Sequence, residues 1–391
     1  MSPLERTLEA ALIPGSNLKG AVAGANWWFL LPSLAVERVV CLGTPTAATL
    51  VALSRMSDEV VVCAQRRRTE KVHRAAERLE LANVSVVESD RDGRNGVVDA
   101  SADVVLLMGR PFGRSRARQT EGEIEGMLRP GGLVYLEFRP VLDRPMVTSA
   151  SERPLGQLGS AQLLWLAPAA GEIRLAAPLG DHQTIAYLER RYLRHAFLRR
   201  GLVRHPRRFL ERHVVVGRLA PRRGALAGQS KTALGVGPPK YLQSLAAQSG
   251  VALERHRWGL AATGEYSSQK VLFFLFSGED EVPQYVAKIT RDPSLNTRLE
   301  NERRALGLLE IGAASALPRP VFFGYQRGLA VLGETAIDGV PFNQRTTATV
   351  GCPFARAALD WLRDSGTGNS DHRELELAGM RAAGKCGLIS I

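Results

Sequence analysis

The sequence lacks the patterns by which several protein classes are recognised. Its four cysteines, Cys41, Cys63, Cys352 and Cys386, form no C-x-x-C pair, and no His/Cys cluster has metal-ligand spacing. These absences exclude a disulfide-stapled fold and a zinc ribbon, and they favour buried free thiols in a reducing compartment. The apolar run at residues 21–36 contains a proline and is shorter than the ~20 residues that a membrane helix needs.

Lysine is also scarce, because only seven of the 51 basic residues are lysine. Such an arginine bias often reflects GC-rich coding, so the net charge of +12 gives little support for a nucleic-acid partner. Nucleotides, phosphates and lipid headgroups are better matched to a basic surface. Peripheral membrane contact through Trp27-Trp28 is the alternative to packing of these rings on the first sheet. The first residues, MSPLERTLEAALIPG, have no signal-peptide pattern, so we expect a cytoplasmic protein.

Residues 1–150 alternate short apolar runs with helical stretches. Strands are expected at 38–43, 59–63, 84–87, 104–108 and 133–138, and helices at 47–57, 71–81 and 121–128. Strands this apolar, alternating with helices, predict an α/β domain whose parallel sheet is covered on both faces.

Three segments of this region carry a family resemblance. They are VVCLGTPTA at 39–47, SADVVLLM at 101–108, and LRPGGLVYLEF at 128–138, where a helix, a Pro-Gly-Gly turn and a strand follow one another. Together they resemble class I S-adenosylmethionine-dependent methyltransferases over roughly residues 25–150. The resemblance implies a Rossmann-like fold and S-adenosylmethionine as the cofactor.

The resemblance also implies cofactor-binding residues. Gly43 would let the backbone approach the ligand, Gln65 stands where a carboxylate usually holds the ribose hydroxyls, and Asp90 would meet the adenine amino group. Cys41 occupies the position of an expected acid, and the later glycines of the turn are missing. An active methyltransferase and a degenerate scaffold domain both stay open. A dinucleotide-binding fingerprint fails because the same glycines and acid are absent.

Residues 151–235 connect two differently patterned halves. Residues 161–167 and 172–177 read as two strands, an antiparallel hairpin that would close the methyltransferase sheet. Residues 184–213 predict an arginine-rich helix, either a solvated connection or a surface for membranes and polyanions. Residues 224–239, rich in glycine, alanine and proline, are expected to be a linker.

From about residue 251 the pattern changes to strands with a single helix. Strands are expected at 258–263, 271–276, 285–289, 321–325 and 329–334, and a helix at 296–309. V-A-K-I at 286–289, E-x-x-x-L-x-x-L from Glu302, L-P-R-P at 317–320 and L-G-E-T-A-I-D-G-V-P-F at 332–342 occur in that order. This series resembles the kinase-like small lobe of the aminoglycoside phosphotransferase and choline kinase-like family, over about residues 251–361.

The kinase-like resemblance implies a nucleotide site for ATP with magnesium. Lys288 would place a cation on the phosphates, and Glu302 would hold that lysine in position. Glu300 competes with Glu302 for this role, and the leucine spacing favours Glu302. Leu332–Glu334 would offer backbone groups to adenine. A loop containing Gly264, Ser267 and Ser268 would face the phosphate oxygens.

The catalytic half of such an enzyme is missing from the sequence. No histidine is followed two places later by aspartate, and only 57 residues follow Glu334. A chain without the general base and the magnesium ligands should not transfer phosphate. A truncated or shifted reading frame, a separate chain that supplies the large lobe, and a non-catalytic binding module are three open explanations.

We therefore expect a methyltransferase-like α/β domain at 1–150, a connecting region at 151–235, a kinase-like α+β small lobe at 236–343 and the start of a large lobe at 344–391. The main hypothesis is an incomplete, non-catalytic phosphotransferase-like protein that retains nucleotide contact. Its ancestral substrate would be a small hydroxylated compound such as a polysaccharide precursor. The alternatives are an S-adenosylmethionine-dependent methyltransferase of unknown acceptor and a structural partner protein.

Overall fold

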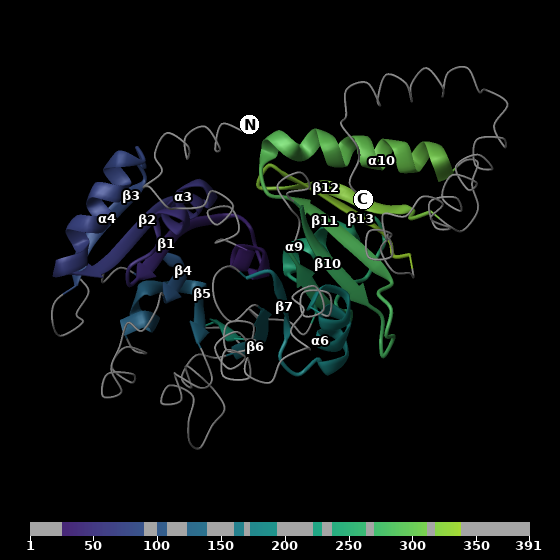
Figure 1. The fold of residues 1–391 in the computed structure, drawn as a ribbon, viewed down its shortest axis with the longest axis horizontal. Coiled ribbons are helices and arrows are strands. Elements are labelled where there is room, and N and C mark those ends of the chain that lie inside the picture. Colours follow the sequence, from purple (N-terminus) through teal and green to yellow (C-terminus); the bar gives the residue numbers. More distant parts are fainter. Residues whose placement is uncertain are drawn as a thin grey trace, which may run out of the picture.

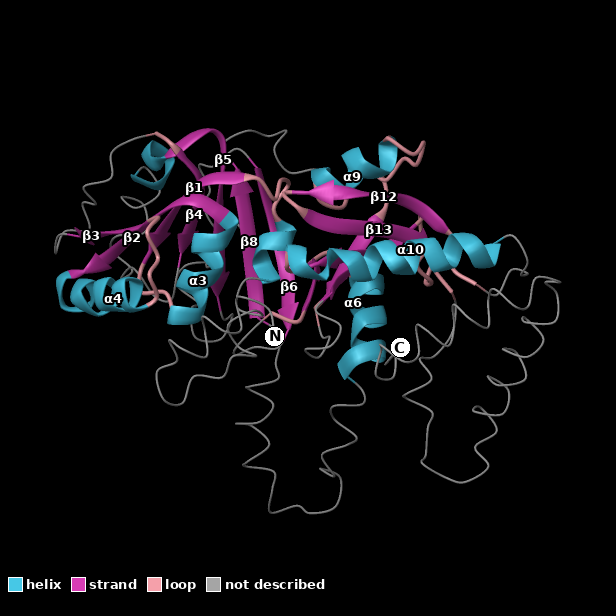
Figure 2. Ribbon diagram, turned by 90° about the horizontal axis from the view of Figure 1, so that it is seen from above, coloured by secondary structure: helices cyan, strands magenta, loops and turns pink. Residues whose placement is uncertain are grey.

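The computed structural model describes residues 26–89, 100–107, 123–138, 160–167, 173–193, 222–228, 237–262, 270–310 and 317–337. We call residues 26–138 the parallel half and residues 237–337 the antiparallel half. Within the described residues, 13 strands form a single sheet in the order β12-β13-β11-β10-β9-β7-β6-β8-β5-β4-β1-β2-β3. The strands follow one another as one continuous band from β3 to β12 (Figure 2).

The parallel half has the doubly wound arrangement that its sequence predicts. Its strands pair in parallel in the order β3-β2-β1-β4-β5. Their bounds are β1 Val36–Leu42, β2 Ser57–Gln65, β3 Val84–Ser89, β4 Ala102–Leu107 and β5 Leu128–Phe138. This is the parallel core of a methyltransferase-like, Rossmann-like α/β fold, in which the strand order reverses between β1 and β4.

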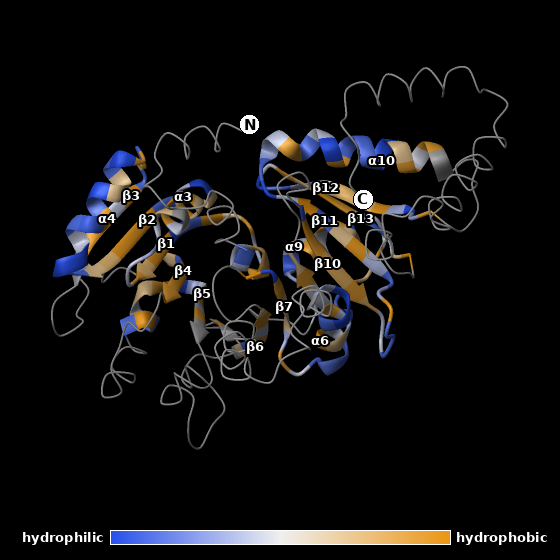
Figure 3. Cartoon of the chain, in the orientation of Figure 1, coloured by the Kyte–Doolittle hydropathy of each residue, from blue (hydrophilic) through white to orange (hydrophobic). Residues whose placement is uncertain are grey.

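Helices cover both faces of this parallel core. Helices α3 (Ala47–Met56) and α4 (Arg66–Arg78) bury apolar side chains on one face, and the helical residues 123–127 bury Ile124 and Met127 on the other. In Figure 3 the outer surface of α4 is hydrophilic while the strands beneath it are hydrophobic. The alternation of apolar runs with amphipathic helices thus correctly predicted that helices cover both faces of the sheet.

The Pro-Gly-Gly segment is not a turn before β5, as the sequence suggested, but lies inside it. Strand β5 begins at Leu128, and its pairing with β4 shifts register between Ala102 and Val104. Gly131 has a positive φ of 84°, and a Cβ on Gly132 would lie 2.7 Å from the carbonyl oxygen of Ala102. Glycines therefore permit an irregularity that continues the strand.

Three strands extend the sheet beyond β5. Strands β6 (Ser160–Ala167) and β7 (Leu175–Pro178) form the expected antiparallel hairpin. The strand that lies beside β5, however, is β8 (Arg222–Gly228), antiparallel to both β5 and β6. Residues 224–228 are therefore strand and not linker, which corrects the sequence prediction. A Cβ on Gly224 would lie 2.7 Å from Leu166, so β8 approaches β6 closely because position 224 has no side chain.

The arginine-rich segment begins as a short helix against the sheet. Helix α6 (His182–Leu188) continues as a π-helical turn, η4 (Glu189–Leu193), and residues 194–213 lie outside the described residues. Asp181 caps α6 by accepting a hydrogen bond from the Thr184 backbone N–H at 3.0 Å. The ring of Tyr187 lies 5.3 Å from that of Phe274 in the antiparallel half. The described part of this segment is therefore packed and not a free helix.

In the antiparallel half, each strand and helix predicted from the sequence is present. Its strands pair in the order β9-β10-β11-β13-β12. The elements are α9 Lys240–Ala247, β9 Arg257–Ala261, β10 Lys270–Phe276, β11 Tyr285–Thr290, the 3-10 turn η6 Pro293–Leu295, α10 Asn296–Glu310, β12 Pro320–Gln326 and β13 Leu329–Thr335. Helices α9 and α10 lie on opposite sides of this sheet (Figure 2).

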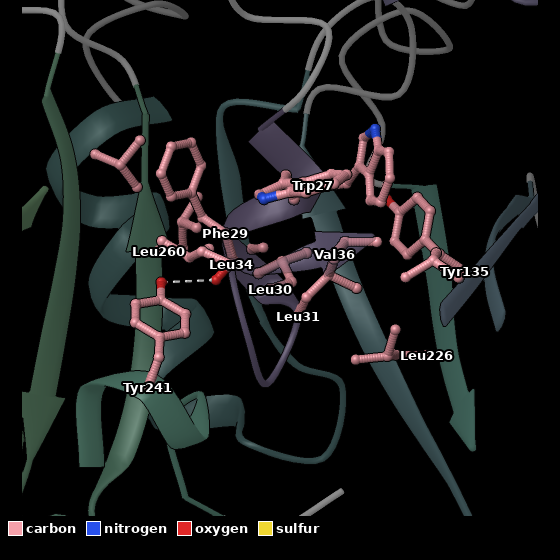
Figure 4. Packing of buried hydrophobic residues seen from close by; sticks show 14 of the residues in the cluster. Trp27, Phe29, Leu30, Leu31, Leu34, Val36, Tyr135, Leu226, Tyr241 and Leu260 are labelled. Atoms are coloured by element: carbon pink, nitrogen blue, oxygen red, sulfur yellow. Dashed lines mark hydrogen bonds between the residues drawn. The ribbon is translucent and has the colours of Figure 1, made fainter. Parts of the chain in front are cut away.

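The two halves are joined by main-chain pairing and by a shared core. Strand β7 pairs with β9, and the 3-10 turn η1 (Asn26–Leu30) lies where the halves meet (Figures 1 and 4). The hydroxyl of Tyr241 donates a hydrogen bond to the carbonyl of Phe29 at 3.0 Å. Trp27 stacks on Tyr135 with ring centroids 5.0 Å apart. One apolar core therefore runs from β2 to β13. No helix among the described residues is long and apolar enough to cross a membrane.

Candidate functional sites

The first candidate site lies at the carboxyl ends of β1 and β2. Gly43 follows β1 with a positive φ of 118°, and its backbone N–H donates to the Cys63 carbonyl at 3.0 Å. The chain then enters α3, whose cap residue Thr46 accepts a hydrogen bond from the Thr49 backbone N–H at 3.1 Å. The N-terminus of α3 consequently lies at the reversal point of the strand order, where doubly wound proteins bind ligands.

The side chains at this edge carry no negative charge at the expected acidic positions. Cys41 and Cys63 are buried free thiols, as predicted. Burial raises the pKa of Cys63 to about 11 and raises the pKa of Cys41 still further above its usual range, so both thiols are neutral at pH 7. Gln65 ends β2 with an exposed side chain, and Asp90 lies outside the described residues. Gln65 therefore places one neutral amide where the methyltransferase resemblance implies a ribose-binding carboxylate.

The second candidate site is a chain of four charged side chains on one face of the antiparallel half. The Lys288 ammonium donates to Glu302 Oε1 at 2.6 Å, so the pair expected from the sequence is present. Lys270 donates to the other oxygen of Glu302 at 2.5 Å, and Lys288 also forms an ion pair with Glu334. The order of contacts is therefore Lys270–Glu302–Lys288–Glu334. We call these four residues the lysine–glutamate cluster.

A polar anchor at the start of α10 brings Glu302 to this cluster. The amide oxygen of Asn296 accepts hydrogen bonds from the Thr290 hydroxyl at 2.7 Å and from the Ala330 backbone N–H at 2.9 Å. These bonds tie the first turn of α10 to β11 and β13. Leu299, one turn later, is fully buried against Ala330 and Leu332. Glu302, a further turn along the same face, is then directed at Lys288.

The structure also separates the two glutamates that the sequence left in competition. Glu300 accepts a hydrogen bond from the Tyr325 hydroxyl at 2.5 Å on the exposed side of α10. Residues two apart on a helix point to different faces. Glu302, and not Glu300, is therefore the partner of Lys288, which agrees with the leucine spacing.

Burial and charge act in opposite directions within the cluster. Burial lowers the pKa of Lys288, but the carboxylates of Glu334 and Glu302 outweigh it and raise that pKa, so the ammonium stays charged. Burial raises the pKa of Glu302, but Lys288 and Lys270 outweigh it, so the pKa is lowered and the carboxylate stays ionised. For Glu334 the effect of burial outweighs the effect of the Lys288 charge, so the pKa of this carboxyl group is raised above its ordinary value.

Other predicted site residues meet a different outcome. Leu332–Glu334 lies within β13, which pairs with β11 on one side and with β12 on the other, with a register shift opposite Glu334. Adenine contact by this segment stays a prediction, and the carboxylate of Glu334 reaches the lysine–glutamate cluster. Gly264, Ser267 and Ser268 lie outside the described residues. The sequence analysis missed Lys270 as a site residue, although it directly follows that loop. No group of His, Cys, Asp and Glu side chains suited to a metal ion is found in the described part of the chain.

Comparisons with known proteins add structural neighbours only. No family model matches the chain, and no curated protein matches it. A SAM-dependent methyltransferase from Aquifex aeolicus is 14% identical, covering 35% of this chain and 73% of that one at a TM-score of 0.25. The tRNA (m1A58) methyltransferase TrmI from Aquifex aeolicus is 13% identical, covering 57% and 75% at a TM-score of 0.30.

A protein described as a sarcosine dimethylglycine methyltransferase, from Galdieria sulphuraria, is 17% identical, covering 54% of this chain and 84% of that one at a TM-score of 0.32. Likeness at these values says nothing about the cofactor or the acceptor. The assignment of the α/β fold rests on the strand order of the parallel half. The kinase-like resemblance of the antiparallel half stays a prediction.

Proposed function

We propose that the parallel half is a methyltransferase-type domain that binds an adenosyl cofactor of the S-adenosylmethionine class. The observation that carries this proposal is Gly43, which turns left-handed between β1 and the N-terminus of α3 at the strand-order reversal. When bound, the cofactor would supply an electrophilic methyl group for transfer to an acceptor. The chain would bind the adenosyl part through the Gly43 turn and the Gln65 amide, at the edge where ligands of doubly wound sheets bind.

Equilibrium dialysis with radiolabelled S-adenosylmethionine tests this proposal. The wild-type chain should retain ligand, and Gly43→Ala should lose it, because a side chain strains a backbone at φ 118° beside the site. Gly131→Ala is the matched control. It introduces the same kind of strain at φ 84°, but near the amino ends of the parallel strands rather than their carboxyl ends, and should keep binding. No retention by the wild type at millimolar ligand would remove the proposal.

As a second candidate function, we propose that the antiparallel half contacts nucleotide phosphates without transferring them. The specific support is Lys288 on the third strand of this half, paired at 2.6 Å with Glu302 on the following helix. In protein kinases a lysine in this position binds the ATP phosphates, and a glutamate on the following helix holds that lysine in place. The remaining parts of such a site, including magnesium ligands and a large lobe from a separate chain, are part of the same proposal.

Calorimetry with ATP and magnesium tests the second candidate function. Lys288→Ala should abolish the binding heat, whereas Lys71→Ala, an exposed lysine on α4, should leave it unchanged. Identical heats for wild type and Lys288→Ala would end this proposal. If neither S-adenosylmethionine nor ATP binds while another chain co-purifies at constant ratio, the structural-partner alternative is favoured.

A further inference from the structure

The carboxylate of Glu334 has no place in a simple phosphate site. Its side chain is only 7% exposed, and its Oε1 is held by Lys288. The other oxygen, Oε2, is buried and has no hydrogen-bond partner among the described residues. A buried acceptor without a partner costs about 1–3 kcal/mol, so such an atom calls for an explanation.

The charges of the lysine–glutamate cluster cancel. Lys270 and Lys288 bring two positive charges, and Glu302 and Glu334 bring two negative ones. With Glu302 alone, the two lysines would keep one net positive charge for an incoming oxyanion. With Glu334 ionised, that net charge is zero, and the ammonium that should receive the oxyanion is already occupied on two sides.

We propose that Glu334 gates Lys288: it competes with oxyanions of the phosphate class for the Lys288 ammonium, so that an oxyanion binds only by displacing the Glu334 carboxylate. This inference rests on the second candidate function and deepens it by naming the residue that sets oxyanion affinity. Glu302 is not the competitor, because it is shared with Lys270 and anchored through α10.

Displacement has a consequence for protons. Burial already raises the pKa of Glu334, and Lys288 is the cation that offsets this effect. When the ammonium turns to an oxyanion, the buried carboxylate loses its counter-charge, and its pKa rises further. Lys270, Lys288 and Glu302 are the charged groups that face Glu334 from β10, β11 and α10, and Glu334 is the carboxyl group whose pKa is raised by burial, so Glu334 takes up the proton. Oxyanion binding is therefore coupled to proton uptake and strengthens as the pH falls towards the pKa of bound-state Glu334.

Titration calorimetry of the full chain with inorganic sulfate tests the gate, because sulfate keeps its charge over the neutral range. Binding heats are measured in two buffers with different ionisation enthalpies, at several pH values. The wild type should show proton uptake and tighter binding at lower pH. Glu334→Gln should bind sulfate at least about tenfold more tightly, since a neighbouring charge shifts such equilibria by one or more powers of ten, and should show no proton uptake.

Glu300→Gln is the matched control, because it removes a nearby carboxylate. That carboxylate contacts Tyr325 and not the lysine–glutamate cluster. It should leave affinity and proton uptake unchanged. Sulfate binding by the wild type without proton uptake overturns the gate, whether or not Glu334→Gln folds. Unchanged affinity in Glu334→Gln overturns it as well and leaves phosphate contact intact. If neither the wild type nor Glu334→Gln binds sulfate or ATP, the second candidate function is overturned, and the gate with it.

Discussion

Replacing Glu302 by glutamine should destabilise the fold in a pH-dependent way. The side chain is 26% exposed and accepts bonds from Lys288 at 2.6 Å and from Lys270 at 2.5 Å. Fully buried pairs cost about 3–5 kcal/mol to break and exposed pairs contribute about 0–1 kcal/mol. For this partly buried carboxylate with two cations we therefore expect a loss of about 2 kcal/mol at pH 7.

The sign of the pH dependence follows from the direction of the pKa shift. The folded-state pKa of Glu302 is lowered, because the two lysines outweigh burial. Its contribution is therefore present above the unfolded pKa of about 4.3 and is lost as the pH falls through the lower folded value. The difference in unfolding free energy between wild type and Glu302→Gln should shrink correspondingly as the solution is acidified below pH ~4.

Urea unfolding followed by circular dichroism, at pH 7 and at several acidic values, measures this difference. Glu300→Gln serves as the control and should cost less than about 1 kcal/mol, because its partner Tyr325 is exposed. A difference for Glu302→Gln that stays constant with pH, or a loss no larger than that of the control, would refute the assignment of Glu302 as the shared carboxylate.

Three further predictions follow from other parts of the molecule. Gln65→Glu restores a carboxylate at the end of β2 and should tighten S-adenosylmethionine about tenfold in equilibrium dialysis, whereas Gln65→Ala should not. Gly333→Ala should cost about 1–3 kcal/mol in urea, because its Cβ would lie 2.2 Å from the Phe322 ring, while Gly307→Ala has nothing within 4 Å and should not destabilise. Tyr241→Phe removes the 3.0 Å bond to Phe29 and should lower the midpoint of one calorimetric transition; two separate transitions in the wild type would contradict the shared core.

The local elements could be predicted well because their signals are local. The apolar runs that became β1, β2 and β4 are buried on both faces. Such continuous runs are typical of fully buried strands, because a strand with one exposed face alternates apolar and polar residues. The lysine of β11 and the glutamate of α10 are 14 residues apart, close enough for strand, turn and helix periodicity to bring them together. The choice of Glu302 over Glu300 also followed from the spacing of leucines along one helix.

Other features could not be predicted because they depend on distant partners. The segment RRGALAG of β8 contains no large apolar residue except Leu226, and it is a strand because β5 and β6 supply partners on both sides. Lys270 and Glu334 are 64 positions apart (334 − 270) and join one cluster only after β10, β11 and β13 align. No pattern along the chain carries that information.

The amino-acid sequence alone determined the type and order of most elements, the parallel core and the Lys288–Glu302 pair, because hydrophobic period and helix spacing act over a few turns of chain. Only the tertiary structure decided that both halves share one sheet, that β8 lies between β5 and β6, and that Lys288 is held by a second carboxylate. These features arise from main-chain pairing and burial between residues far apart in sequence, where the free energy depends on which strands become neighbours.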